Sequence, residues 1–221
     1  MRINRAIVME FLGSLVLTVA IVGSGHMATF LAADNGLALF INALATALGL
    51  ATVIRIGMKV SGAHFNPAVS FVMLILKKIT LKVFFLYFIA QVCGAIFGAL
   101  LANLLFDQKI LVQSEISRSG TNLFISEIFA TSVLIWIILR FARRDDLIAF
   151  YVPIWIFGAI IFTSSSSFAN PAITIGRIFT TSIVGISPSS VLAFILAQLI
   201  GAMLGTLIAK QITNPGKENN E

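Results

Sequence analysis

The sequence predicts an all-α membrane protein with six transmembrane helices and two re-entrant half-helices, arranged as an inverted three-helix repeat. Three observations support this fold class. Hydrophobic residues make up 58% of the 221 residues and charged residues only 11%, whereas soluble domains carry about 25% charged residues. Apolar stretches of membrane-spanning length recur along the chain, and one set of short motifs occurs in both halves.

Six apolar stretches are long enough to cross the roughly 30 Å hydrocarbon core of a bilayer. We expect these spans at 6–32, 37–57, 82–106, 121–141, 147–164 and 189–210. Two further apolar pieces, at 62–76 and 166–185, are too short to cross after their own loops. They are therefore predicted to enter and leave on one side, within a single transmembrane domain over residues 1–221.

The basic residues predict the orientation, because cytoplasmic loops carry an excess of Lys and Arg. With the N-terminus inside, the cytoplasmic side collects Arg2, Arg5, Arg55, Lys59, Lys77, Lys78, Lys82, Arg140, Arg143, Arg144, Lys210 and Lys217. The outer side keeps Lys109, Arg118 and Arg177. This bias predicts a multi-pass protein of the cell (plasma or inner) membrane with both termini cytoplasmic. It also explains the net charge of +6 without nucleic-acid binding.

The internal repeat sets the architecture. Each half, at 5–106 and 121–210, has a glutamate in its first span, then an Asn-Pro-Ala motif, then a Gln-x-x-Gly motif. The repeated residues are Glu10 and Glu127, Asn66-Pro67-Ala68 and Asn170-Pro171-Ala172, and Gln91 to Gly94 and Gln198 to Gly201. Since each half holds an odd number of full spans, the second half must cross the bilayer upside down, a plan that forms substrate sites near the midplane.

The Asn-Pro-Ala motif has a clear helical meaning. Asn is a preferred N-cap, and Pro fits the first turn, where its missing N–H costs nothing. Asn66 and Asn170 are therefore expected to begin two half-helices whose positive N-terminal ends face each other at the midplane. The Asn amides would donate into a narrow pore while the dipoles repel cations. This arrangement predicts a conduit for small neutral polar molecules, with no chemical step.

These motifs resemble the major intrinsic protein family, the aquaporins and aquaglyceroporins, over about residues 5–210. The resemblance implies a homotetramer with one pore in each subunit. The runs Gly23–Gly25, Asn42–Thr46 and Phe168–Arg177 are most similar to bacterial aquaglyceroporins of the type encoded beside arsenic-resistance genes.

The sequence departs from the family at the selectivity filter. Most members have an arginine three residues after the second motif Asn, and here that position is Ile173. An ungapped count from the two Asn residues puts the other filter positions at Thr46, Gly158 and Ser167, so the aromatic and histidine of water-selective members are missing too. The resemblance therefore implies a wide, mildly polar constriction.

Several charged residues allow two interpretations. Arg177, one helical turn outside Ile173, either supplies charge to the outer vestibule or bonds loop carbonyls and headgroups. Glu10 and Glu127 either relay protons or accept backbone N–H bonds from the re-entrant loops. His64 either gates the inner pore by titration or braces its loop.

Three functions can be compared. A channel for small uncharged solutes such as glycerol, urea, water and arsenite fits the pore motifs. An ion- or anion-permeable channel is the alternative, because the filter arginine is lost. An enzyme does not fit, because no nucleophile motif or metal spacing occurs. The single Cys93 and the distant His26 and His64 predict no metal site, and no cofactor is expected. The expected partners are small neutral solutes and the lipid bilayer.

Overall fold

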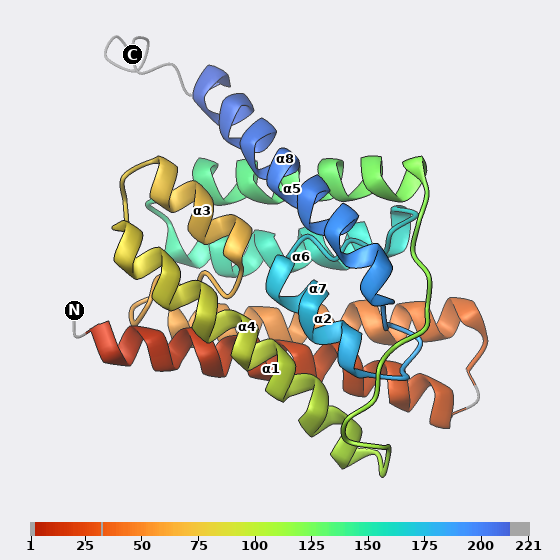
Figure 1. Cartoon of the computed structure of the whole chain (residues 1–221). Coiled ribbons are helices and arrows are strands. Elements are labelled where there is room, and N and C mark those ends of the chain that lie inside the picture. Colours follow the sequence, from red (N-terminus) through yellow and green to blue (C-terminus); the bar gives the residue numbers. More distant parts are fainter. Residues whose placement is uncertain (1–2, 32, 213–221) are drawn as a thin grey trace, which may run out of the picture.

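A computed structural model describes residues 3–31 and 33–212, and within these ranges every regular element is a helix (Figure 1). Residues 1–2, 32 and 213–221, which include Arg2 and Lys217, lie outside the described part. The elements are α1 (Ile3–Phe30), α2 (Asn35–Gly57), α3 (Pro67–Ile75), α4 (Leu81–Leu105), α5 (Thr121–Arg140), α6 (Asp145–Phe162), α7 (Pro171–Gly176), the 3-10 helix η1 (Arg177–Phe179) and α8 (Pro188–Ile212).

Six of these helices, α1, α2, α4, α5, α6 and α8, are long and apolar enough to cross a membrane. The predicted spans agree with them to within a few residues at each end. The two short helices α3 and α7 both pack against α4 and α8, and they fall within the predicted re-entrant pieces. The fold class predicted from the sequence is confirmed.

The helices pack in two matching sets. In the first half α1 packs against α4 and α2, and in the second half α5 packs against α8 and α6, while α2 and α6 join the halves. Glycines allow the closest crossings: a Cβ at Gly94 would collide with the carbonyl oxygen of Phe11, and one at Gly201 with that of Ile128. These close crossings lie within the chain, between α1 and α4 and between α5 and α8.

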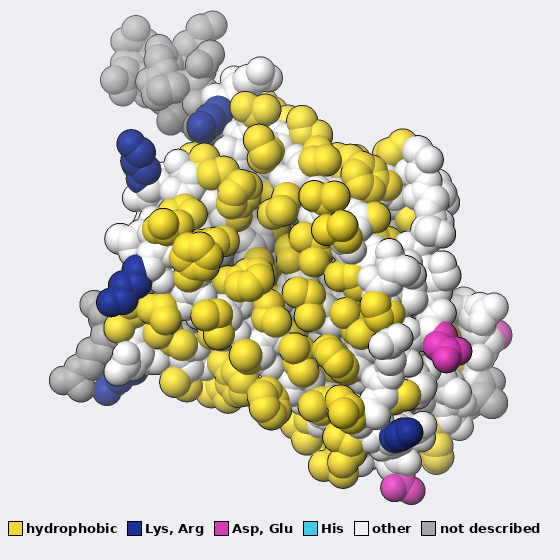
Figure 2. Space-filling view, in the orientation of Figure 1, with side chains coloured by type: hydrophobic (Ala, Val, Ile, Leu, Met, Phe, Trp, Pro, Cys, Tyr) yellow, Lys and Arg dark blue, Asp and Glu magenta, His cyan; other side chains and the backbone are white. Residues whose placement is uncertain are grey.

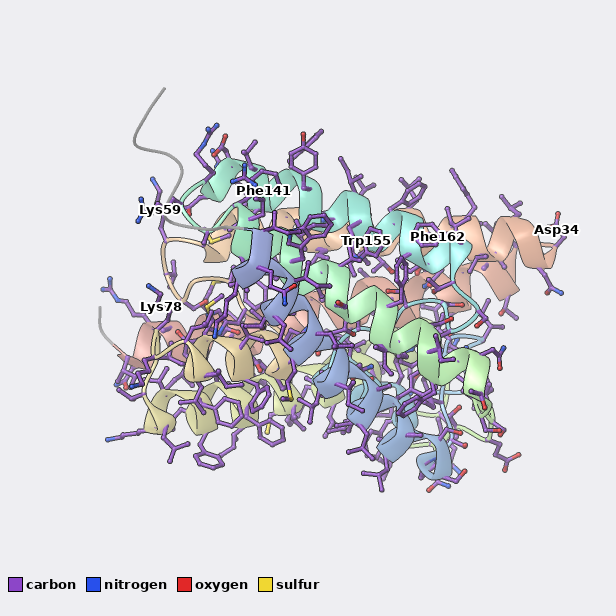
Figure 3. All side chains as sticks on the ribbon, turned by 90° about the horizontal axis from the view of Figure 1, so that it is seen from above. Asp34, Lys59, Lys78, Phe141, Trp155 and Phe162 are labelled. Atoms are coloured by element: carbon purple, nitrogen blue, oxygen red, sulfur yellow. The ribbon has the colours of Figure 1, made fainter. Side chains whose placement is uncertain are left out.

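The surface matches a bilayer environment. Hydrophobic side chains cover the middle of the face in Figure 2, and Lys and Arg side chains gather toward one end of the bundle. That end carries Lys59 and Lys78, whereas Asp34 and Phe162 lie at the opposite end (Figure 3). The basic end is the one at which α1 begins and α8 ends (Figure 1).

Candidate pore and its two half-helices

The two motif asparagines cap the two half-helices. Asn66 Oδ1 accepts a hydrogen bond from the backbone N–H of Ala68 at 2.9 Å, and Asn170 Oδ1 accepts from Ala172 at 3.0 Å and Ile173 at 3.3 Å. In each case the following proline occupies the first turn. The local sequence therefore fixes where both half-helices begin.

The amide nitrogens of the same asparagines join the two halves. Asn66 Nδ2 donates to the carbonyl oxygen of Ala169 at 2.7 Å, and Asn170 Nδ2 donates to that of Phe65 at 2.8 Å. The sequence interpretation aimed both amides into the pore and missed this exchange. Each amide nitrogen has two N–H groups. One donates across the junction, and the other is available to the cavity that both side chains line.

Glu10 of α1 organises the first re-entrant loop. Its carboxylate accepts from the backbone N–H groups of His64 at 3.0 Å and Phe65 at 2.6 Å, from the Ser61 hydroxyl, and from Gln91 Nε2 at 2.8 Å. Glu10 is fully buried. Four donors therefore satisfy a carboxylate that has no cation partner within the described chain.

Glu127 of α5 repeats this arrangement in the second loop. It accepts from the backbone N–H groups of Phe168 and Ala169, both at 2.9 Å, from Ser165 Oγ at 2.7 Å and from Gln198 Nε2 at 2.7 Å. Both glutamates therefore fasten a loop, a half-helix and a neighbouring span to one another. These contacts correspond to the loop-bracing interpretation of the two carboxylates.

The fastened loops hold unfavourable backbone conformations. Phe65 and Ala169, the residues just before the two asparagines, have φ values of 47° and 46°, and Ala63 and Ser167 are also left-handed. Such residues cost on the order of 1–3 kcal/mol each and persist only where the surroundings hold them. The glutamate bonds provide that restraint at Phe65 and Ala169.

A cavity of about 470 Å³ adjoins the two half-helix N-termini, since both Asn66 and Asn170 line it. It is lined by one face each of α1, α2, α5 and α6 together with both re-entrant loops. Its polar lining residues are Asn42, Thr46, His64, Asn66, Lys78, Arg143, Asp145, Ser166, Ser167, Asn170 and Arg177. The other lining residues are mostly aliphatic, so the cavity has an apolar wall with a sparse line of polar groups.

Three of the four predicted filter residues line this cavity, namely Thr46, Ser167 and Ile173. Gly158 is not among the lining residues, and the nearest side chain to it is Phe162 of its own helix. Ile156 and Ile160 line the cavity instead, because residues four apart share one face of α6. The ungapped count from Asn170 thus selected a glycine that faces away from the cavity, and the wall there is aliphatic.

Two cavity-lining hydroxyls have no protein partner within the described residues: Thr46 Oγ1 and Ser167 Oγ. Buried polar atoms are usually hydrogen-bonded, so these two oxygens are the groups on the cavity wall that most need a partner. The sequence placed these residues at the filter but gave no sign that their oxygens are left free.

His64 and the basic end of the cavity, with Lys78 and Arg143, form a second polar region. His64 Nδ1 lies 3.0 Å from Ser70 Oγ, and its ring packs edge-on to Tyr87 with centroids 5.3 Å apart. His64 therefore both lines the cavity and braces α3 and α4. The exposed Arg144 forms an ion pair with Asp146 at the start of α6.

His26 and Cys93 lie away from the cavity lining. His26 Nε2 is 3.0 Å from Asn103 Oδ1 and 3.3 Å from Thr180 Oγ1, which ties α1 and α4 to the segment after η1. Cys93 is a half-buried free thiol. Within the described residues no group of three His, Cys, Asp or Glu side chains could hold a metal.

The sequence profile of the family described as "Major intrinsic protein" matches residues 1–164 and 147–221. The chain belongs to the major intrinsic protein family. It is 40% identical over 216 residues to the aquaglyceroporin AqpS of Rhizobium meliloti (strain 1021), which covers 97% of this chain and 93% of the relative. It is 31% identical to the aquaporin TIP1-1 of Arabidopsis thaliana, over 78% of this chain and 74% of the relative.

The fold agrees with this family assignment. The X-ray structure of the aquaglyceroporin from Plasmodium falciparum superimposes with a TM-score of 0.76, at 24% identity, over 96% of this chain and 97% of that one. Aquaporins and aquaglyceroporins are channels, not enzymes. This member is therefore a multi-pass membrane channel for small solutes.

Proposed function

We propose that the cavity is a passive pore for small uncharged solutes, with glycerol, urea and water as candidates and arsenite as a further one. The observation that carries this proposal is the junction of the two half-helices. Asn66 and Asn170 line the cavity at the N-termini of the two half-helices, so hydroxyl and carbonyl oxygens of a solute meet N–H donors there.

The same junction supports the exclusion of cations. Each half-helix presents the positive end of its dipole to the cavity, and that field repels cations including hydronium. Thr46 Oγ1 and Ser167 Oγ, both unpaired, supply the next polar contacts along the path. The aliphatic wall of Ile156, Ile160 and Ile173 offers nothing to replace the hydration shell of an ion.

The organisation of the chain around this pore is part of the proposal. Residues 1–221 form one channel domain with inverted repeats at 5–106 and 121–210. The basic end of the bundle faces the cytoplasm, the protein resides in the plasma or inner membrane, and four copies assemble with one pore each. The Lys and Arg excess at one end supports this orientation, and the repeated motifs support the inverted repeat. The assembly of four copies is carried over from the family.

A stopped-flow light-scattering panel on proteoliposomes tests the solute class. Glycerol, urea and water should each enter faster than into empty liposomes. Asn66→Asp and Asn170→Asp place an acceptor where the junction needs a donor to Ala169 or Phe65, so neutral-solute flux should fall roughly tenfold or more. Either variant conducting glycerol at the native rate, with normal assembly, contradicts the proposed role of the asparagines.

The ion-permeable alternative rests on the isoleucine at position 173, which replaces the arginine usual in the family. A conductance recording in planar bilayers separates the two functions. Native protein should carry neutral solutes without measurable current, and a current under the same conditions would favour the alternative.

A further inference from the structure

Arg177 occupies an unusual place on the cavity wall. It is the first residue of η1, directly after α7, and only 4% of it is exposed. It lines the cavity one helical turn beyond Ile173. The α2 and α6 residues that line the outer end are Asn42 and Ile160, so Arg177 belongs to the outer part of the path and not to the open surface.

The guanidinium of Arg177 is held in a fixed direction. Its Nε donates to the carbonyl oxygen of Val184, and its central carbon lies 3.3 Å from the centroid of the Phe168 ring. Phe168 is itself restrained, because its backbone N–H bonds Glu127 and its ring packs edge-on to Phe194 with centroids 4.9 Å apart. The charge cannot easily leave the cavity wall.

The rest of the guanidinium is left free. An arginine has five N–H donors, and within the described residues the structure gives Arg177 one hydrogen bond and no carboxylate partner. Its terminal nitrogens form no hydrogen bond with the described protein, yet they are not fully covered by protein atoms. They are therefore open to the cavity that Arg177 lines. A cation without a counter-ion is tolerated there only if water in the cavity hydrates it.

We infer that Arg177 is the outer cation barrier and hydrogen-bond donor of this pore, displaced one helical turn outward from Ile173, and that Phe168 positions it. The inference deepens the proposed function and rests on it. The Arg177 guanidinium places a positive charge near the constriction that the sequence predicts to be wide. This charge repels cations, and the guanidinium offers several N–H donors to hydroxyl or carbonyl oxygens. Solutes with several such oxygens are therefore favoured over water where the cavity passes Arg177.

The competing explanation is that Arg177 only ties down the segment that contains Val184. Arg118 is the matched control, because it also lies near the Phe168 ring, at 5.2 Å, and donates to the carbonyls of Gly185 and Ile183. Unlike Arg177, it is not among the residues that line the cavity. A loop brace and a pore group can therefore be told apart by comparing the two arginines.

The test uses Arg177→Gln and Arg118→Gln in planar bilayers under a KCl gradient and in proteoliposomes. Arg177→Gln should open a cation current and shift the glycerol-to-water permeability ratio by roughly twofold or more. Arg118→Gln should lower thermal stability and leave current and ratio native. The inference is overturned if folded Arg177→Gln keeps both native values, or if the two variants change stability alone.

Two milder variants keep the test decisive if Arg177→Gln does not fold. Arg177→Lys keeps the charge and loses the planar donors, so it should still exclude cations while the permeability ratio changes. Phe168→Leu keeps the arginine and removes the ring beneath it, so it should shift the same ratio. Native ratios in both would overturn the inference. Glycerol flux through the native protein reports separately on the proposed function.

Discussion

The two re-entrant loops have the same backbone anchoring and different side chains at the cavity. Glu10 and Glu127 each accept two consecutive backbone N–H groups, one serine hydroxyl and one glutamine amide. The first N–H in each pair belongs to His64 in one loop and to Phe168 in the other. His64 bonds Ser70, whereas Phe168 supports Arg177.

The comparison distinguishes contacts that hold the fold from residues that face the cavity. The contacts that match in both halves hold the loops, cap the half-helices and join the two junction carbonyls to the two asparagines. The residues that do not match face the two ends of the cavity. We therefore expect substitutions in the matching contacts to change stability by equal amounts in both halves, and substitutions in the unmatched ones to change transport.

The largest expected effect comes from the two buried glutamates. Glu10→Ala and Glu127→Ala each leave four donors without their shared acceptor, including two backbone N–H groups. Each should cost on the order of 3–5 kcal/mol, since a buried donor left unsatisfied costs about 1–3 kcal/mol and the loops can relax only in part. Thermal unfolding in detergent and the yield of assembled protein measure the loss.

The comparison breaks if one glutamate variant is stable and the other is not. Normally assembled variants with a changed pH profile of transport would instead favour a proton relay. Glu10→Gln and Glu127→Gln serve as controls, because the amide oxygen still accepts and should retain part of the stability.

The glycine crossings come next. Gly94→Ala and Gly201→Ala bring a Cβ against the backbone of Phe11 and Ile128, so each should destabilise by about 1–3 kcal/mol as α1 and α4, or α5 and α8, are forced apart. Gly23→Ala is the control, because its Cβ would meet only a Phe106 ring carbon at 3.5 Å. A lower melting temperature for the control than for the two crossing variants would contradict this packing.

A smaller effect is expected from matched substitutions on the two half-helices, α3 and α7, which should differ in their effect on transport. Ser70→Ala and Thr174→Val each remove a hydroxyl that accepts from the neighbouring glutamine, and each should cost about 1 kcal/mol. Ser70→Ala also frees His64, which lines the cavity, so it should alter water and glycerol permeability while Thr174→Val leaves them native. Equal transport in both variants would show that His64 is only a brace.

Much of this fold could be predicted because each element carries its own local signal. Span length follows from apolar runs, and the half-helix starts follow from Asn followed by Pro. The contacts of Glu10 and Glu127 were predictable in kind because two intramembrane carboxylates in matching places need matching partners. The orientation relative to the membrane and the assembly of four copies remain predictions.

The site was predicted less completely because it depends on how loops bend. Counting back from Asn170 reached Gly158, but the helix face that meets the cavity carries Ile156 and Ile160. The exchange of amide bonds between Asn66 and Asn170 also needs both loops in place. Neither a rotated helix face nor a contact between distant segments leaves a periodic signal in the sequence.

The central claim is that solutes pass through the cavity lined by the two motif asparagines, and one pair of variants tests it most directly. Thr46→Trp puts a large ring into the cavity, whereas Leu48→Trp puts the same ring on the exposed side of α2. Stopped-flow glycerol uptake in proteoliposomes should be abolished by Thr46→Trp and stay native with Leu48→Trp. Native glycerol uptake in a folded Thr46→Trp variant would contradict the pore described here.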